Sequence, residues 1–139
     1  MRVTELQVVY MRDTGDERGR SYSPCASWPG LLHGAEDLHL TTVGPGCRRG
    51  DHYHKAKHEL IIVQYRDRWS LHWDRGEGTS IERHSFKGEG AVVLSVPPLV
   101  SHTIRNDGGS DLHLCAISDR QYDPELADAF PRMLMQNEG

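Results

Sequence analysis

The sequence predicts an all-β domain in which short strands close into a sandwich or a barrel. Short runs rich in apolar residues recur along the chain, and turn-forming residues such as glycine, proline and aspartate separate most of them. At 139 residues the chain is long enough to bury the core of one such domain. Many short strands with turn signals between them are typical of closed β architectures. The predicted strands cover residues 6–11, 38–43, 59–65, 69–73, 81–86, 91–96, 101–105 and 111–118.

Two turns and one continuous run define the middle of the chain. The strands at 59–65 and 69–73 are predicted to form a hairpin across residues 66–68. The sequence Asn-Asp-Gly-Gly at 106–109 is the strongest hairpin turn signal in the chain. The run 91–96 is apolar at nearly every position, which predicts a strand that is buried on both faces.

The end of the chain carries a pattern that is typical of a helix start. Asp123 is followed by proline and glutamate, which suits an N-cap, a proline at the first helical position and an acidic first turn. We therefore expect a short helix over 124–130. No repeat or linker interrupts the sequence, so residues 1–139 are expected to form one domain with a barrel core of about 36–118.

Composition argues against several classes of partner. There are 16 Lys and Arg against 20 Asp and Glu, and no basic run exceeds Arg48-Arg49, so we expect no nucleic-acid partner. The longest apolar stretches, such as 60–63 and 91–94, are too short to span a bilayer. The N-terminus has no apolar signal core, and the three cysteines are widely spaced. These features predict a cytoplasmic protein with reduced thiols and no membrane contact.

Four side chains define a candidate metal site. His52 and His54 lie at strand spacing, so both imidazoles project from one face. His102 comes from a distant strand, and Glu59 adds a carboxylate. Three imidazoles and a carboxylate suit one divalent ion, and the set does not distinguish zinc, iron, manganese or nickel. Histidines that act as catalysts without a metal are the alternative.

The position of Glu59 requires a turn before it. The interval from His54 is odd, so an unbroken strand would place Glu59 on the opposite face. A turn through residues 55–58 returns the carboxylate to the histidine face. If His58 is the ligand instead, the other face of the strand at 59–65 lines the interior.

These residues resemble the first motif of the cupin superfamily. That motif runs from a glycine through two histidines to a glutamate, and Gly46, His52, His54 and Glu59 have the matching spacing. Arg66 stands where the motif has its closing glycine. The resemblance implies a double-stranded β-helix, or jelly-roll barrel, with an interior about wide enough for one small ligand.

The second cupin motif is similar to residues 97–106. Pro97, His102 and Asn106 have the expected spacing, although Leu99 replaces the usual internal glycine. Two half-motifs in the right order are more specific than one His-x-His pair, and they extend the likeness over most of the chain.

The finer string around the two histidines is similar to cupin domains that act on nucleotide-linked sugars. One branch is the C-terminal epimerase domain of capsular polysaccharide reductase-epimerases. It shares an Arg-Gly-x-His-x-His string and a chain end like Tyr122-Asp123-Pro124, although Asp119-Arg120 departs from the Asn-Glu of that family. The other branch is the nucleoside-diphosphate keto-sugar 3,4-ketoisomerases, which share the His pair and an acidic Tyr-Asp end. His102 favours the first branch.

Both branches imply removal of a proton from a carbon next to a ketone. We therefore expect a small metal-dependent epimerase or isomerase that acts on a keto sugar nucleotide, with a homodimer as the assembly. A histidine bound to metal cannot be the base, so Lys57, His113 or Tyr65 must then move the proton. Without a metal, His54 is the base.

Cations are needed to bind the diphosphate of such a substrate. Arg49 and Arg105 are the candidates because each neighbours a motif, and Tyr65 is a further candidate contact to the substrate.

Two other classes of function compete with this interpretation. The same ligand set suits an Fe(II)-dependent cupin dioxygenase, which would need oxygen and a redox-active metal. A non-catalytic binder of a small ligand would be stabilised by that ligand without turnover.

Overall fold

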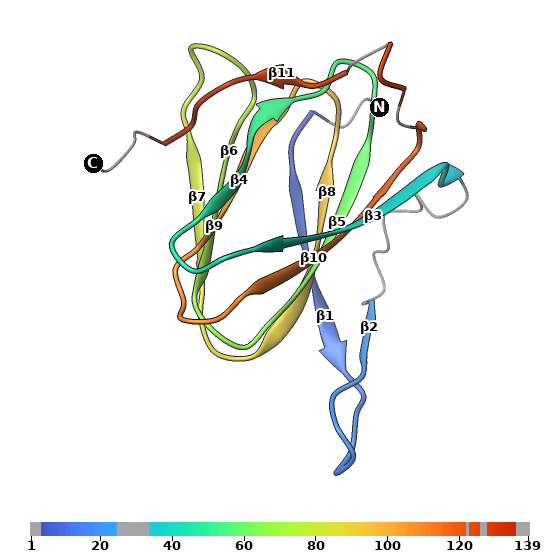
Figure 1. Cartoon of the computed structure of the whole chain (residues 1–139), viewed down its shortest axis with the longest axis vertical. Coiled ribbons are helices and arrows are strands. Elements are labelled where there is room, and N and C mark those ends of the chain that lie inside the picture. Colours follow the sequence, from blue (N-terminus) through green and yellow to red (C-terminus); the bar gives the residue numbers. More distant parts are fainter. Residues whose placement is uncertain (1–3, 25–33, 122, 126–127, 136–139) are drawn as a thin grey trace.

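The chain folds into two antiparallel β-sheets that face one another across an apolar interior (Figure 1). The computed structural model describes residues 4–24, 34–121, 123–125 and 128–135. The strands are β1 (Gln7–Asp13), β2 (Tyr22–Pro24), β3 (Asp37–Val43), β4 (Arg48–Tyr53), β5 (Glu59–Tyr65), β6 (Trp69–Asp74), β7 (Glu82–Phe86), β8 (Gly90–Val96), β9 (Ser101–Asn106), β10 (Leu112–Ser118) and β11 (Phe130–Pro131). The all-β prediction is confirmed, and the arrangement is that of a cupin-like jelly roll.

Most connections carry the chain from one sheet to the other. The six-stranded sheet has the order β2-β1-β8-β5-β10-β3, and the five-stranded sheet has the order β11-β4-β9-β6-β7. Because β5 and β6 belong to different sheets, as do β9 and β10, neither predicted hairpin forms. The turns at 66–68 and 106–109 instead lie side by side, where Gly109 N–H donates to Asp67 Oδ2 at 3.0 Å. Turn chemistry predicts a reversal, but long-range pairing decides which strand becomes the neighbour.

Alternation along β5 sets the inside of the barrel. Ile61 and Val63 belong to the main core, whereas Leu60 and Ile62 belong to a second cluster on the other face of the sheet. Glu59 is therefore the first of the inward-facing residues of β5. This is the arrangement that the sequence predicted if Glu59, and not His58, faces the interior. The neighbouring β8 is buried from residue 91 to residue 96, which confirms the prediction of a strand covered on both faces.

The helix expected over 124–130 is wrong for the residues that the structure describes there. Asp123 Oδ1 does accept the backbone N–H of Glu125 at 2.9 Å, but this contact closes a turn. Phe130–Pro131 then pairs with β4 as β11. The Asp123 side chain makes the contact that an N-cap would make, but no helix follows in the described residues, and strand pairing at the barrel rim takes its place.

The first part of β1 pairs with β8 in the barrel, whereas its end pairs with β2 and extends from the barrel as an arm, at the bottom of Figure 1. The sequence predicted β1, whereas β2, which ends at Pro24, was not among the predicted strands. Among the described residues, no helix is long and apolar enough to cross a membrane.

Candidate functional site

The centre of the site is a pair of histidines on neighbouring strands. His52 of β4 lies directly opposite His102 of β9, and a bulge between Gly50 and His52 sets this register. Gly50 has φ of +111°, and a Cβ there would overlap the carbonyl oxygen of His102. Asp51 has φ of +55°, and its backbone N–H donates to Thr103 Oγ1 at 3.1 Å. The bulge therefore needs glycine at residue 50 and presents His52 to His102.

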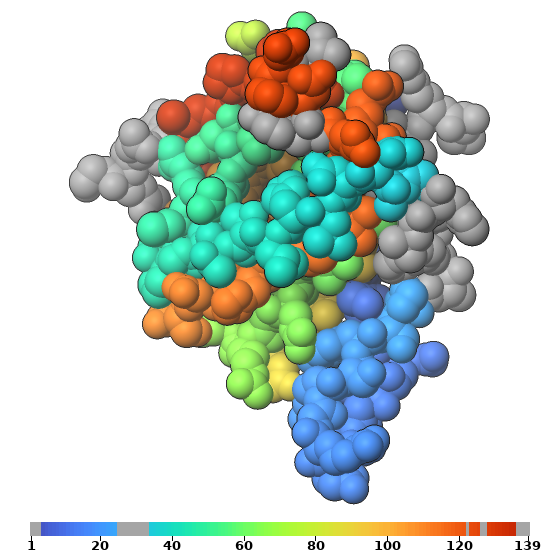
Figure 2. Space-filling model, turned by 45° about the vertical axis from the view of Figure 1, so that its right-hand side comes forward, coloured from blue at the N-terminus to red at the C-terminus, as the bar shows by residue number. Residues whose placement is uncertain are grey.

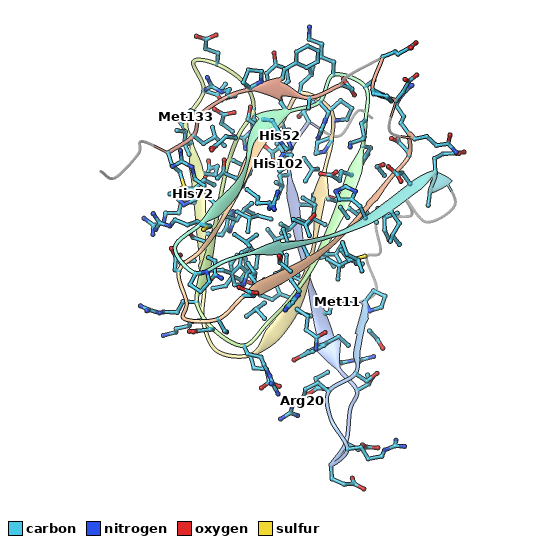
Figure 3. The ribbon with its side chains drawn as sticks, in the orientation of Figure 1. Met11, Arg20, His52, His72, His102 and Met133 are labelled. Atoms are coloured by element: carbon cyan, nitrogen blue, oxygen red, sulfur yellow. The ribbon has the colours of Figure 1, made fainter. Side chains whose placement is uncertain are left out.

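A third imidazole, that of His54, joins this pair. The ring centroids of His52 and His102 are 4.8 Å apart, and those of His52 and His54 are also 4.8 Å apart. One ring nitrogen from each of His52, His54 and His102 lies within 4.8 Å of the others. Figure 3 shows His52 and His102 beside one another in the upper half of the barrel, with His72 well apart.

His54 is held by two hydrogen bonds although it lies just beyond β4. Its side chain is 6% exposed. The Nδ1–H of its ring donates to the backbone carbonyl of Asp128, and its own carbonyl accepts the N–H of Leu99 at 2.6 Å. Its Nε2 is buried and has no hydrogen-bond partner in the part of the chain that the structure describes. A neutral imidazole with Nδ1 protonated carries its free lone pair on Nε2, so this nitrogen is available to a proton or a metal ion.

Glu59 lies beside the three histidines with a cation of its own. One carboxylate oxygen is 3.6 Å from His102 Nε2, and the other is 3.5 Å from Lys57 Nζ. Glu59 is 5% exposed, and Lys57 is half-buried. The compact group of ligand atoms consists of the three imidazoles, with the carboxylate adjacent to it.

The turn that the sequence required between His54 and Glu59 is present. Residues 55–58 are outside both strands, and the carboxylate of Asp128 accepts the backbone N–H groups of Lys55, Ala56 and Lys57 at 2.8, 3.1 and 2.9 Å. His58 leads away from the cluster, since its Nε2 lies 2.9 Å from Ser95 Oγ. Of the two alternatives, the structure therefore brings Glu59 to the histidines.

Burial shapes the charges of the site. Desolvation and the neighbouring His102 and His54 lower the pKa of His52 to about 4, and desolvation also lowers the pKa of His54. Burial alone would raise the pKa of Glu59, but the hydrogen bond and charge of His102, with Lys57, lower it to about 2. At neutral pH the site therefore combines neutral His52 and His54 with an ionised carboxylate.

The cluster lines a cavity of about 710 Å³. Arg48 and Arg49 also line it, together with polar groups of β3 such as His39 and Thr41. Arg49 Nε donates to the carbonyl of Thr42 at 3.1 Å. Figure 2 shows the C-terminal segment, in orange and red, against the β4 region. A volume of this size suits a small organic molecule.

Three predicted residues do not line this cavity. His113 is exposed on β10, and Tyr65 packs in the core against Trp69 with a centroid distance of 5.6 Å. Arg105 lies on β9 with Nε 2.5 Å from Asp107 Oδ1 and lines a different hollow. The alternation of side chains along a strand explains why His113 and Arg105 miss the cavity. On each strand the residues next to them face the core, so these two side chains face outward.

Two residues near the site escaped the sequence reasoning. Arg48 was recognised only as part of a short basic run, although its place within the first motif, next to Arg49, could have indicated the cavity. Asp128 carried no signal, because it is 74 residues from His54 in the sequence and its contacts depend on tertiary structure.

The residues of the cluster fit a divalent metal ion. The unpartnered, buried Nε2 of His54 offers a free lone pair beside two more imidazoles and a carboxylate. Two of the histidines also hold their Nδ1 against backbone carbonyls, His54 against Asp128 and His102 against Val100 at 3.4 Å. Metal-binding histidines are commonly oriented in this way.

The fold and this site define a small cupin-like barrel with a histidine-lined cavity. A family model for the polysaccharide biosynthesis C-terminal domain matches residues 31–130, and the chain belongs to that family. No curated protein sequence matches the chain.

Three solved structures illustrate the shared fold. The capsular polysaccharide assembling protein CapF from Staphylococcus aureus superposes with a TM-score of 0.64 at 19% identity, over 88% of this chain and 34% of CapF. The 3,4-ketoisomerase QdtA from Thermoanaerobacterium thermosaccharolyticum, in complex with TDP-4-keto-6-deoxyglucose, gives 0.66 at 14% identity over 93% and 88%. NovW, a 4-keto-6-deoxy sugar epimerase from Streptomyces spheroides, gives 0.67 at 14% over 91% and 68%. The chain thus spans about a third of CapF and most of QdtA, and the resemblance to the cupin sugar epimerases and isomerases is confirmed.

Proposed function

We propose that this domain is an epimerase or isomerase that transfers a proton at a carbon next to the ketone of a keto sugar nucleotide. The observation that carries the proposal is the buried Nε2 of His54, which has no hydrogen-bond partner among the described residues and lies in one cluster with His52 and His102. Burial lowers the pKa of both His54 and His52, which favours their neutral forms at pH 7, and the ammonium of Lys57 lies close by at Glu59. Family membership and the activities named for QdtA and NovW support the same class.

His54 is the proposed base. Its Nε2 takes the proton from the carbon, and the electron pair of the broken C–H bond moves into an enolate whose oxygen carries the negative charge. Returning the proton to the other face of the same carbon inverts it. Relocating the ketone requires a hydroxyl on the carbon that lost its proton. That hydroxyl gives up its proton and becomes the new carbonyl, while the former carbonyl carbon and its oxygen each take up a proton.

A base alone does not account for such a reaction. A positioned base contributes roughly 10²–10⁴-fold, so the developing charge on the enolate oxygen needs electrostatic stabilisation as well. Lys57 is the proposed cation, because its ammonium lies beside Glu59 at the edge of the cluster. This assignment leaves Tyr65 and His113 without a role in proton transfer.

A divalent ion held by His52, His54 and His102, with Glu59 alongside, would supply Lewis-acid stabilisation of the enolate. The Nε2 of His54 would then be occupied. Of the three groups that the sequence predicted for proton transfer beside a metal, Lys57 is the one that lines the cavity, and it would move the proton.

The substrate is proposed to enter with its diphosphate towards Arg48 and Arg49. Both arginines line the cavity, and guanidinium groups recognise phosphate oxygens in a fixed geometry. Arg105, which the sequence favoured equally, lines a different hollow and is not part of this proposal.

The predicted homodimer and cytoplasmic location also remain proposals. Leu38 and Leu40 on the edge strand β3 are 59% and 77% exposed, which supports an apolar contact with a second copy. Light scattering of the purified protein, with a monomer mass as the contradicting result, tests the dimer.

The activity is tested by incubating the protein with TDP-4-keto-6-deoxyglucose and following the sugar by proton NMR. A new epimer or a ketone relocated to carbon 3 is the expected result. A sugar that is unchanged while the same compound raises the melting temperature would instead support a non-catalytic binder. Elemental analysis separates the metal-dependent forms: iron with oxygen-dependent turnover would favour the dioxygenase, and absence of metal in an active protein would favour His54 as the base.

A further inference from the structure

Asp128 contacts the histidine site through both its carboxylate and its backbone. The Oδ1 atom accepts the N–H of Lys55 at 2.8 Å, and Oδ2 accepts those of Ala56 and Lys57 at 3.1 and 2.9 Å. The backbone carbonyl of the same residue accepts the Nδ1–H of His54. Asp128, a single residue of the C-terminal segment, therefore contacts four consecutive residues, 54–57, in the link between β4 and β5.

The carboxylate contacts control the geometry of that link. Three successive N–H groups that point at one carboxylate fix the direction of the turn, and charge-assisted hydrogen bonds of this kind are stronger than neutral ones. The turn must bring Glu59 onto the same face as the histidines, because an unbroken strand would place it on the opposite face. Lys57, within this turn, supplies the cation next to that carboxylate.

The carbonyl contact controls the protonation of His54. A carbonyl oxygen can only accept, so the facing Nδ1 must carry the proton, and in the neutral ring Nε2 is then the nitrogen with the free lone pair. The other tautomer would place its N–H at Nε2, where the described residues offer no acceptor. Both the proposed base function and any metal binding need the first tautomer.

We propose that Asp128 is a positioning residue for the site: its carboxylate shapes the 55–57 turn, and the carbonyl so held keeps His54 in the tautomer with Nε2 free. The inference deepens the proposed function, since it assigns control of the base. The inference about Asp128 concerns the protein without substrate, so its test needs neither substrate nor metal.

The test compares Asp128→Ala with Asp123→Ala in protein labelled with ¹⁵N. Asp123 is a matched control, because it is an exposed aspartate of the same segment whose carboxylate accepts the N–H of Glu125. Two quantities are measured at neutral pH: the ¹⁵N shifts of the His54 ring, which report its tautomer, and the hydrogen-exchange rates of the amides of Lys55, Ala56 and Lys57.

In the wild type and in Asp123→Ala, His54 is expected as the Nδ1–H tautomer and the three amides as protected. In Asp128→Ala, the ring proton is expected to distribute over both nitrogens, and the amides are expected to exchange about tenfold faster or more, as for loss of a hydrogen bond. A folded Asp128→Ala protein in which His54 stays entirely Nδ1-protonated would overturn the inference, whatever its amides do.

Asp128→Asn keeps the inference falsifiable if the alanine variant does not fold. The amide retains one oxygen for Lys55 but turns an NH₂ group towards Ala56 and Lys57. Faster exchange is therefore expected at Ala56 and Lys57 with Lys55 still protected, together with partial loss of the Nδ1–H tautomer. Wild-type values at all four positions would contradict the role. The Asp128 variants could lose the Nδ1–H tautomer and the amide protection while the wild-type protein fails to convert the sugar. That combination would refute the proposed reaction and leave the positioning role of Asp128 intact.

Discussion

The two ends of the barrel interior are built by the same strands and differ completely in character. Strand β5 begins with Glu59 at the histidine end and finishes with Tyr65 at the other. Strand β9 runs from His102 towards Asn106, which lies opposite Trp69. At this second end the rings of Trp69 and Phe86 stack with centroids 4.1 Å apart and close the core.

Backbone strain is concentrated at the histidine end. Among the described residues other than glycine, positive φ occurs at Asp51, with +55°, and at Leu99, with +72°. Asp51 precedes His52 in the bulge, and Leu99 donates its N–H to the carbonyl of His54. Residues in such conformations cost on the order of 1–3 kcal/mol and are held by their surroundings. The contrast indicates that the packed end stabilises the barrel while the strained end holds the groups that we propose react.

The largest effect is expected from removing the base. His54→Ala should lower the rate of sugar conversion by roughly 10²–10⁴-fold, because a positioned base contributes that much. The rate is measured by NMR under saturating substrate. His113→Ala is the control, since His113 is exposed and lines a different hollow from the cluster. Equal loss in both variants would contradict the placement of the reaction at the cluster.

The opposite pattern is expected at the packed end. Trp69 is fully buried against Phe86, so Trp69→Ala should lower the free energy of unfolding by about 3–5 kcal/mol through the cavity that it leaves. Urea denaturation measures this loss, and the rate per folded molecule should change far less than in His54→Ala. A variant of wild-type stability would show that this end is not the structural core.

Acid should destabilise the protein through the histidine end. The pKa of His52 is about 4 in the fold against 6.5 for the free side chain, so the unfolded chain binds the proton first as the pH falls. The free energy of unfolding should therefore decline between about pH 6.5 and pH 4. Glu59, with a pKa of about 2 against 4.5, adds a further decline below about pH 4.5. Urea midpoints across this range measure the slope, and His52→Asn should flatten its upper part; an unchanged slope would refute the assignment.

The smallest effect is expected from relieving strain. Leu99 is 52% exposed at φ of +72°, where the cupin motif has glycine. Leu99→Gly should therefore stabilise the barrel by up to about 1 kcal/mol, since glycine adopts this conformation without a steric penalty but gains freedom in the unfolded chain. Thermal unfolding detects the shift, and a clear loss of stability would mean that the leucine side chain contributes packing that outweighs its strain.

The contrast also explains what the sequence could reveal. Period-two patterns and turn residues predicted eight of the strands closely, and the motif spacing predicted that His52, His54, Glu59 and His102 would meet. Local signals gave the wrong partners for β5 and β9, because a tight turn suits a crossing between sheets as well as a hairpin. Asp128 could not be found, since its contacts form only when the end of the chain reaches the 55–57 turn. Leu99 appeared as a departure from the motif, and its positive φ shows that the turn itself was retained.

The central claim is that the histidine cluster moves a proton at a carbon beside a ketone. The most direct measurement is the incorporation of solvent deuterium into TDP-4-keto-6-deoxyglucose, followed by NMR and mass spectrometry in heavy water. The account predicts catalysed exchange next to the ketone by the wild type and its loss in His54→Ala. A wild-type protein that binds this sugar nucleotide yet incorporates no deuterium above the uncatalysed rate would contradict the claim.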